Sequence, residues 1–486
     1  MRLNYRVILH ILGILITING GFMLLTLIFS GKEDFYGILL AGLITSSVGG
    51  GLFFFTKNFS NRDVKKKEGY LIVTAGWLIM SIFGTLPYLL TDTIPEYTNA
   101  FFETLSGYST TGATILKDIE SLPTGVLFWR SLTQWIGGMG IIVLTVAVLP
   151  ILGIGGMQLF VAEAPGISPD KLQPRIKETA KRLWYIYLGL TIAETMLLWV
   201  GGMTFYDAIN HALTTMATGG FSTKNASIAH FQAPFIQYVI TLFMFLAGTN
   251  FTLTYFGLHG KFKKIIFNEE FKLYFLTCII LAVGVGITIF LIGDDSLEKS
   301  FRDSLFQVVS FITTTGYTTT DYTSYYPFIT LLFFVLLFFG ASAGSTAGGV
   351  KLVRHIILIK NSILELKRQI HRSAILPVRF NKRAVSRDIV FNILAFIMIY
   401  IVIFAGGSVI VSMFGVDFVT SMGSVATCLG NVGPGFGLSD SGVVAVADFA
   451  DFPSEGKWFL SLLMLLGRLE LFTVLILFTP FFWRKY

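Results

Sequence analysis

Four short polar turns, each containing a glycine, recur in a chain that is otherwise strongly apolar. They read Thr110-Thr111-Gly112-Ala113 (turn 1), Thr218-Gly219-Gly220-Phe221 (turn 2), Thr314-Thr315-Gly316-Tyr317 (turn 3) and Asn431-Val432-Gly433-Pro434 (turn 4). Backbone carbonyl oxygens can replace the hydration shell of a dehydrated cation. Glycine favours this arrangement because it adopts backbone conformations that most L-residues resist. The pattern therefore predicts stacked rings of main-chain oxygen ligands, with the threonine hydroxyls as a further oxygen layer or as bonds to neighbouring backbone.

A short, partly apolar segment precedes each turn, and an apolar stretch follows it. We expect the segments to be helices whose N-caps, counted back from the turn glycines, are Asn99, Asp207, Asp303 and Asp417. Helices this short cannot cross a bilayer, so each predicts a re-entrant element that enters from outside and returns. Irregular backbone at membrane depth must be buried or reached by ions, so the turns should share one polar axis, with Tyr317 and Phe221 supporting them from behind.

The composition places the 486-residue chain among polytopic membrane proteins, because 53% of it is hydrophobic and only 13% is charged. The apolar stretches are residues 8–29, 35–56, 70–91, 125–152, 183–203, 233–257, 272–293, 326–359, 388–413 and 457–483. The first is too long for a signal peptide. We therefore expect an all-α polytopic membrane protein with ten transmembrane helices, four re-entrant pore helices and a pseudo-fourfold channel-like repeat.

The net charge of +7 reflects orientation in the membrane. With the N-terminus inside, 28 of the 36 Lys and Arg residues fall in cytoplasmic loops, as the positive-inside rule expects. Arg130 and Arg468 lie within apolar stretches. The outside loops are acidic, which either raises the local cation concentration at an entrance or is ordinary solvated loop charge.

The motifs in and before the turns resemble one known family. They are Phe102-Glu103, Asn210-His211, Phe306-Gln307 and Gly430-Asn431-Val432-Gly433-Pro434-Gly435. With the four turns they resemble the Trk/Ktr/HKT superfamily of potassium transporters over residues 65–486. The two additional N-terminal stretches make the chain most similar to the TrkH type.

This resemblance implies potassium as the substrate, bound at the turn residues, and no cofactor on this chain. It also implies a homodimer with one pore per subunit in the bacterial inner membrane, both termini cytoplasmic, and a TrkA-like cytosolic ring that binds nucleotide as regulator. Glycine in all four turns is the pattern associated there with potassium preference, whereas sodium-preferring relatives carry serine in the first turn. The basic stretch 351–387 could dock the regulator or anionic lipid, and residues 158–182 are a second docking candidate.

The repeat suggests a division of the chain into five parts. We expect an N-terminal two-helix extension at 1–62, pore repeat 1 at 63–157, pore repeat 2 at 158–258, pore repeat 3 with a broken inner helix at 259–360, and pore repeat 4 at 361–486.

Ten small residues, 340–349, interrupt the eighth apolar stretch and form a poor helix. The resemblance identifies them as a gating loop beneath the turns, and the alternative is a close helix-packing face. The gate residues that we expect are Gly340, Gly344, Ser345, Gly348, Gly349 and Arg468. Arg468 should repel cations and bond carbonyls or hydroxyls of this small-residue segment, or else pair with Glu194. Glu470 is a poor partner for Arg468, because residues two apart on a helix face different ways.

The leading functional interpretation is a gated potassium conduit. A proton- or sodium-coupled symporter is the alternative, and it would need membrane acids such as Glu194 or Glu470 near the ion path. An enzyme is excluded by the lack of a His-Glu-x-x-His motif or paired intramembrane aspartates. For Glu103, His211 and Gln307 on the short segments, hydrogen bonds that hold the turns are expected rather than catalysis.

Overall fold

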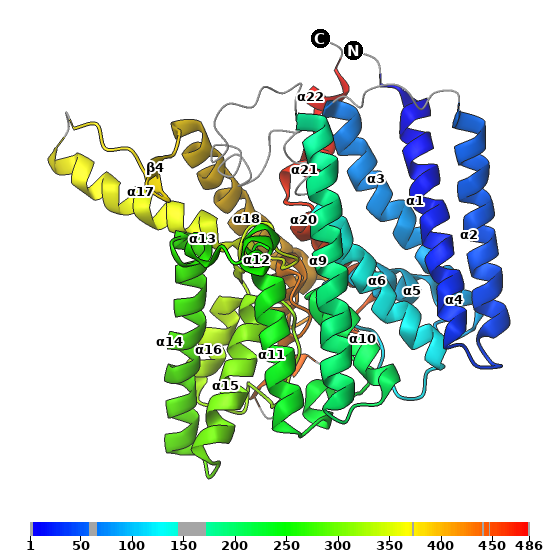
Figure 1. The fold of residues 1–486 in the computed structure, drawn as a ribbon, viewed down its shortest axis with the longest axis horizontal. Coiled ribbons are helices and arrows are strands. Elements are labelled where there is room, and N and C mark those ends of the chain that lie inside the picture. The colour runs from blue at the N-terminus through cyan, green and yellow to red at the C-terminus, as the bar shows by residue number, and fades with distance from the viewer. Residues whose placement is uncertain are drawn as a thin grey trace.

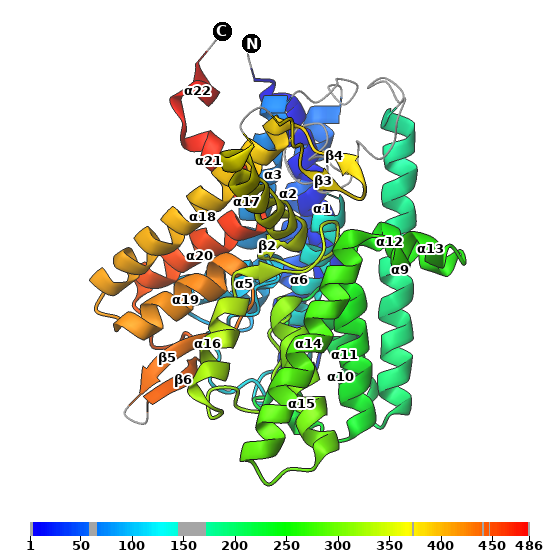
Figure 2. The same cartoon turned by 90° about the vertical axis from the view of Figure 1, so that its left-hand side faces the viewer.

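The computed structural model describes residues 3–57, 66–143, 172–371, 374–439, 442–446 and 448–484, and these are mostly helical. In the first half the helices are α1 (Tyr5–Leu25), η1 (Thr26–Ile28), α2 (Phe35–Thr56), α3 (Lys66–Gly84), α4 (Leu86–Leu90), α5 (Tyr97–Tyr108), α6 (Thr124–Val143), α9 (Leu172–Val200), α10 (Phe205–Met216), η5 (Ser227–His230) and α11 (Pro234–Gly248). They continue with α12 (Phe251–Leu258), α13 (Phe262–Ile266), α14 (Glu269–Ile292), α15 (Leu297–Ile312), α16 (Pro327–Leu336), α17 (Leu352–Ile370), α18 (Arg387–Met413), α19 (Phe418–Gly430), α20 (Ser454–Arg468), α21 (Phe472–Leu475), η6 (Ile476–Phe478) and α22 (Pro480–Trp483). The start of α1 and α22 lie at the same end of the molecule (Figures 1 and 2).

Three small strand pairs add to the expected all-α architecture. β1 (Phe339–Gly340) pairs in parallel with β2 (Val350–Lys351). β3 (Arg379–Phe380) pairs with β4 (Arg383–Ala384), and β5 (Gly435–Ser439) pairs with β6 (Gly442–Val446), both antiparallel. The β5–β6 hairpin follows turn 4 directly and lies at the end of the molecule away from α22 (Figure 2).

Within the described residues, six helical segments are long and apolar enough to cross a bilayer. They are Tyr5–Ile28, Phe35–Thr56, Lys66–Leu90, Glu178–Val200, Glu269–Ile292 and Arg387–Met413. They correspond to six of the ten stretches expected from the sequence, and together they make this a membrane protein with several apolar helices.

Three of the other four expected stretches are not single straight helices. Residues 233–257 form α11 and α12, bent by 110°, and residues 457–483 contain a bend of 111° after α20. The stretch 326–359 becomes the short helix α16, a loop and the start of α17. In the fourth stretch, 125–152, the described residues form the helix α6, and residues 144–152 lie outside the described residues.

Helices α1 and α2 form a tight hairpin that packs against α3 (Figure 1). Small residues allow this approach. A Cβ on Gly20 would lie 2.6 Å from the Ser46 amide nitrogen, and one on Gly49 would lie 2.5 Å from the Thr17 amide nitrogen. Close backbone contact through small residues is the usual way in which membrane helices associate.

Four short helices, α5, α10, α15 and α19, precede the four turns, and they begin differently from three of the four expectations. Asn99, Asp207 and Asp303 all lie inside their helices, which begin earlier, after Glu96, Thr204 and Ser296. Asp207 instead acts from the first turn of α10, where it exchanges hydrogen bonds with Thr204. Asp417 does cap α19, by accepting a hydrogen bond from the Thr420 amide.

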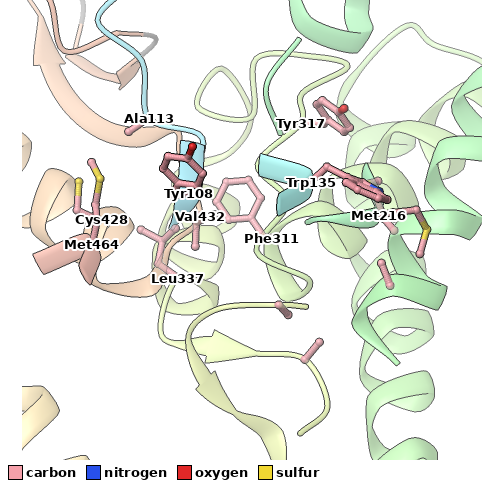
Figure 3. Close-up of a cluster of buried hydrophobic side chains, with 14 of the residues drawn as sticks. Tyr108, Ala113, Trp135, Met216, Phe311, Tyr317, Leu337, Cys428, Val432 and Met464 are labelled. Atoms are coloured by element: carbon pink, nitrogen blue, oxygen red, sulfur yellow. The ribbon is translucent and has the colours of Figure 1, made fainter. Parts of the chain in front are cut away.

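The hydrophobic core surrounds the C-terminal ends of these short helices. Figure 3 shows side chains from several of them, including Tyr108, Met216, Phe311 and Cys428, gathered with Val432 of turn 4. The turns therefore lie inside the protein and not on its lipid-facing surface.

Candidate functional site

Each short helix ends in the same local structure. The first residue of each turn has a left-handed backbone, with φ of 52° at Thr110, 53° at Thr218, 56° at Thr314 and 54° at Asn431. The next amide closes the helix end, in the bonds Thr111 N to Ser106 O (2.9 Å), Gly219 N to Thr214 O (2.9 Å), Thr315 N to Ser310 O (2.9 Å) and Val432 N to Thr427 O (3.0 Å). This is the Schellman helix ending, in which glycine usually takes the left-handed position. Threonine there costs about 1–3 kcal/mol, and such strain clusters at functional sites.

The third residue of each turn is a glycine that packs against the neighbouring turn. All four glycines have positive φ: 82° at Gly112, 77° at Gly220, 79° at Gly316 and 105° at Gly433. A Cβ would lie 2.1 Å from Gly219 O at Gly112, 1.9 Å from Thr315 O at Gly220, 2.0 Å from Val432 O at Gly316 and 2.7 Å from Thr111 O at Gly433. Turn 1 thus contacts turn 2, turn 2 contacts turn 3, turn 3 contacts turn 4, and turn 4 contacts turn 1. The contacts close a ring.

A second set of contacts closes the same ring two residues after each glycine. The carbonyl group of this residue accepts a hydrogen bond from the part of the chain that follows the preceding turn of the ring. Turn 4 precedes turn 1 in this order. The donors and acceptors are Phe449 N to Thr114 O (2.7 Å), Arg130 Nη1 to Ser222 O (3.0 Å), Ala229 N to Thr318 O (3.1 Å) and Tyr322 Oη to Gly435 O (3.0 Å). The cyclic order is the same as in the glycine contacts.

The carbonyl oxygens of the turns are largely free of protein partners. Over the first three residues of each turn, no described protein group donates a hydrogen bond to a carbonyl oxygen except at Gly219. Most of these residues are buried, whereas Gly112, Gly220 and Gly316 keep partial access to solvent. Buried backbone carbonyls normally find a partner, so this set can accept an external ligand such as a cation.

Hydrogen bonds from the short helices hold the segment that follows each of the first three turns. The carboxylate of Glu103 accepts from the Thr114 hydroxyl (3.0 Å) and the Ile115 amide (2.9 Å). His211 Nε2 lies 3.0 Å from the Ser222 hydroxyl, and Gln307 donates to Thr320 O (3.1 Å). These bonds agree with the hydrogen-bonding role expected for the three residues.

Tyr317 and Phe221 lie behind the turns. Tyr317 is fully buried, and its hydroxyl contacts the carbonyl oxygens of His211 (3.3 Å) and Phe221 (3.4 Å). The Phe221 ring lies 3.5 Å from the guanidinium carbon of Arg130.

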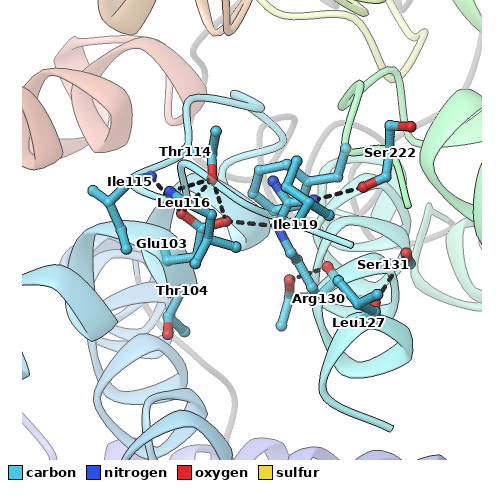
Figure 4. A network of polar contacts seen from close by, with 12 residues as sticks. Glu103, Thr104, Thr114, Ile115, Leu116, Ile119, Leu127, Arg130, Ser131 and Ser222 are labelled. Atoms are coloured by element: carbon cyan, nitrogen blue, oxygen red, sulfur yellow. Dashed lines mark hydrogen bonds and ion pairs between the residues drawn. The ribbon is translucent and has the colours of Figure 1, made fainter. Parts of the chain in front are cut away.

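Arg130 also forms an ion pair with Glu103 (2.6 Å; Figure 4). Sequence reasoning placed Arg130 in an apolar stretch but missed this pair, which the rule that membrane charges pair with one another could have suggested.

The small-residue segment 340–349 is a loop rather than a helix, so a helix-packing face is wrong. β1 and β2 pair at its two ends, and all five expected glycine and serine gate residues lie within it. Its bonds reach several surrounding elements: Ser342 N to Gly248 O (3.0 Å), Thr346 Oγ1 to Met216 O (3.0 Å), Gly348 N to Thr314 Oγ1 (2.6 Å) and Phe251 N to Gly344 O (3.1 Å). The bond from Gly348 to Thr314 connects it directly to turn 3.

Arg468 is the last residue of α20, at the bend, and not in the middle of a straight helix. It is buried and donates to Thr346 O (2.7 Å) and Gly137 O (3.2 Å). The contact with the small-residue segment is as expected. The alternative pair with Glu194 is wrong, because Arg468 donates to two backbone carbonyls and no described group bonds either carboxylate oxygen of Glu194. Glu470, two residues further on, pairs with Arg354 of α17.

A small cavity of about 10 Å³ separates the small-residue segment from the end of α20. Its lining residues are Ala347, Gly348, Gly349, Lys351, Gly467, Arg468 and Glu470. This volume is close to the space that one water molecule needs. The cavity therefore has room for about one water molecule.

Charged side chains also connect the loops around the turns. Lys117 pairs with Asp451 (2.7 Å), and this carboxylate raises the pKa of Lys117. Asn225 donates to Asp118 (3.0 Å), and this hydrogen bond lowers the pKa of Asp118. Both carboxylates therefore already have protein partners.

Comparisons with known proteins agree with this architecture. Residues 37–485 match the TrkH family model, described as a cation transport protein. The chain is 38% identical to the Trk system potassium uptake protein TrkH of Salmonella typhimurium over 99% of this chain and 100% of the relative, and 37% identical to that of Halomonas elongata over 99% of each chain or more. The crystal structure of the potassium transporter TrkH from Vibrio parahaemolyticus matches with a TM-score of 0.90 at 35% identity, covering 99% of this chain and 100% of that one. The chain therefore belongs to the TrkH family, and it is a membrane potassium uptake transporter of the Trk type rather than an enzyme.

Proposed function

We propose that potassium crosses this chain through a channel-like pore on the common line of the four turns. The observation that carries the proposal is the closed ring of contacts, in which each turn glycine lies against a carbonyl of the next turn. The carbonyl groups of the ring are then near neighbours around one line. Such an arrangement can replace the water around a monovalent cation.

In this proposal the selectivity filter consists of the first three residues of each turn. The ligands are main-chain oxygens of Thr110, Thr111, Gly112, Thr218, Gly219, Gly220, Thr314, Thr315, Gly316, Asn431, Val432 and Gly433. A side chain at a turn glycine would collide with the neighbouring carbonyl, which supports the assignment of glycine to potassium preference. The ion is the cargo, and no resident cofactor is required.

The gate in this proposal is the small-residue segment with Arg468. The guanidinium is buried and donates a hydrogen bond to a carbonyl of the segment, so it places a positive charge directly beside the segment. A buried positive charge at this level opposes cation passage. Movement of the segment, with Gly340, Gly344, Ser345, Gly348 and Gly349 as its flexible points, would open the path.

We further propose the five-part division given by the sequence, with 1–62 as the extension and four pore repeats at 63–157, 158–258, 259–360 and 361–486. The positive-inside rule supports cytoplasmic termini, and the shared position of α1 and α22 agrees with it. The relatives belong to the Trk system, which supports a homodimer in the bacterial inner membrane and a TrkA-like nucleotide-binding ring as partner. The helix α17, which projects from the body in Figure 1 and carries Lys367 and Arg368 in its last turn, is a docking surface for that ring or for anionic lipid.

Ion-coupled symport is the competing mechanism. Of the two acids that could serve it, Glu470 is held by Arg354, whereas Glu194 is fully buried on α9. Symport would therefore depend on Glu194.

The proposal is tested by flux of potassium, rubidium and sodium into liposomes that contain this chain alone, compared with Gly112→Ser. We expect potassium and rubidium uptake that follows their gradients in the wild type, and a clear gain of sodium flux relative to potassium in the variant. Equal sodium and potassium flux in the wild type, or an unaltered ratio in Gly112→Ser, contradicts the carbonyl filter.

A further inference from the structure

Turn 2 is the least supported of the four turns by its own side chains. At its second residue it has Gly219, where the other turns have Thr111, Thr315 and Val432. The Thr111 hydroxyl bonds Ser109 (2.6 Å), and the Thr315 hydroxyl bonds Thr313 (2.8 Å). Two consecutive glycines give turn 2 the greatest backbone freedom, so something else must fix its conformation.

Gln134 of α6 occupies the place of the missing side chain. A Cβ on Gly219 would lie 2.3 Å from Gln134 Cδ and 2.4 Å from its Oε1. The buried carboxamide donates to Gly219 O (2.7 Å) and accepts from Phe221 N (3.1 Å). It therefore bonds the backbone on both sides of Gly220.

Arg130 holds the backbone directly after turn 2. It lies one helical turn before Gln134, on the same face of α6. Its Nη1 donates to Ser222 O, while its Nε pairs with Glu103 of α5 (Figure 4). The guanidinium also covers the Phe221 ring. One buried side chain thus connects the helix before turn 1 to the backbone after turn 2.

The equivalent contacts at the other turns use different chemistry. Turns 1 and 3 receive backbone amides, from Phe449 and Ala229, and turn 4 receives the Tyr322 hydroxyl. Among the described residues, turn 2 and the residue after it are instead held by two side chains of α6. These are the guanidinium of Arg130 and the carboxamide of Gln134. The support of the ring is therefore unequal, although its backbone geometry is similar in all four turns.

We propose that Gln134 and Arg130 are positioning residues that set cation selectivity, with the Gln134 carboxamide acting as the side chain that Gly219 lacks. The inference rests on the proposed function, because it assumes that turn 2 is one quarter of a filter. It goes further by assigning selectivity to two side chains that do not touch the ion. Their loss should widen or loosen turn 2 and admit sodium.

The test compares potassium-to-sodium flux ratios in liposomes for Gln134→Met, which keeps length and volume but removes both hydrogen bonds. We expect the ratio to fall about tenfold, since two bonds to buried backbone are lost. Ser131→Ala is the matched control, because Ser131 is a buried neighbour on α6 whose hydroxyl, among the described residues, bonds only Leu127 O of its own helix. Its ratio should equal that of the wild type.

Restoration of a side chain at position 219 provides a readout that a general loss of stability would not produce. Gly219→Thr alone should lower the ratio, because the new side chain collides with Gln134. In combination with Gln134→Ala, which removes the obstruction, it should recover part of the selectivity. A double variant no better than Gln134→Ala contradicts the idea that the carboxamide replaces a side chain.

The failures of the two proposals can be distinguished. A non-selective wild type, or a Gly112→Ser variant with wild-type ratio, argues against the filter itself. A selective wild type that responds to Gly112→Ser while Gln134→Met keeps its ratio overturns the inference about Gln134 and Arg130. If Gln134→Met does not give a monodisperse protein, Arg130→Lys tests the same support. Lysine retains the charge facing Glu103 but lacks the fork that also reaches Ser222 O, so an unchanged ratio overturns the inference.

Discussion

The four turns and the small-residue segment 340–349 are both irregular, glycine-rich and buried, yet they are held in opposite ways. Each turn is closed by hydrogen bonds to its own short helix and by contacts with the two neighbouring turns. The segment has one strand pair at its ends and an internal bond from Ser345 Oγ to Ser342 O (2.6 Å). Its bonds to the surroundings go to several separate elements, such as α10, α11, α20 and turn 3.

This difference suggests how a rigid element and a movable one can lie in contact. A change in one turn must disturb the ring, because every turn has two neighbours. The outward bonds of the segment can be exchanged a few at a time, because they are divided among several elements. Rigidity is what selectivity requires, and exchangeable bonds are what gating requires.

The largest effect is expected when the ring itself is broken. In Gly316→Ala the new methyl group would lie 2.0 Å from Val432 O, at a φ of 79° that L-residues rarely adopt. The strain of about 1–3 kcal/mol should lower the potassium-to-sodium flux ratio by roughly tenfold or more. Gly406→Ala on α18 is the control, because a Cβ there meets nothing within 4 Å. Similar ratios in the two variants would count against the ring.

Removal of the buried charge should release the segment without changing the ring. Arg468→Ala eliminates the bonds to Thr346 O and Gly137 O together with the positive charge. We expect potassium flux to rise several-fold while the ratio to sodium stays the same. Arg468→Lys keeps the charge, so its potassium flux should lie between those of the wild type and Arg468→Ala. Flux equal to the wild type in Arg468→Ala removes the barrier role.

A smaller effect is expected at the contact between the two regions. Thr314→Val keeps the branched shape in turn 3 but deletes the hydroxyl that accepts from Gly348 N. One hydrogen bond of about 1 kcal/mol corresponds to roughly a fivefold change in the open fraction of the gate. Single-channel or flux recordings should show higher activity with unchanged selectivity. Thr241→Val, whose hydroxyl bonds its own helix, is the control. A change in selectivity without a change in activity would place Thr314 in the filter alone.

The smallest effect is expected at Glu194, outside both regions. If potassium follows its own gradient, Glu194→Gln should leave the rate nearly unchanged, and neither protein should respond to an imposed pH gradient. Proton-driven uptake that disappears in Glu194→Gln would instead support coupled symport. Uptake by proteoliposomes with and without a pH gradient distinguishes these results.

Local patterns predicted the turns because their structure depends on nearby residues. A glycine soon after a threonine, or after Asn431 in turn 4, is a short-range signal at a helix end. The structure places all four turns in contact. The positions of the helix starts were harder. Asn99, Asp207 and Asp303 are good caps by type, but Thr204 and Ser296 precede two of the helices and cap them earlier, so the helices are longer than expected.

Partners distant in sequence were the main source of error. Gln134 lies 85 residues from Gly219, and its role depends on how α6 packs against turn 2. The bends after α11 and α20 were also missed, since apolar composition alone does not mark where a helix breaks. Arg468 was found because a charge within an apolar stretch stands out locally, but its exclusion from a pair with Glu194 required the packed structure.

The proposed function requires that the four turns hold a dehydrated cation on one line. The most direct measurement is a crystal structure of this chain in rubidium, with anomalous scattering collected at the rubidium edge. We expect anomalous density on the line through the ring formed by Gly112, Gly220, Gly316 and Gly433, at positions surrounded by carbonyl oxygens of the turns. Ordered rubidium elsewhere in the protein with none inside this ring would contradict it.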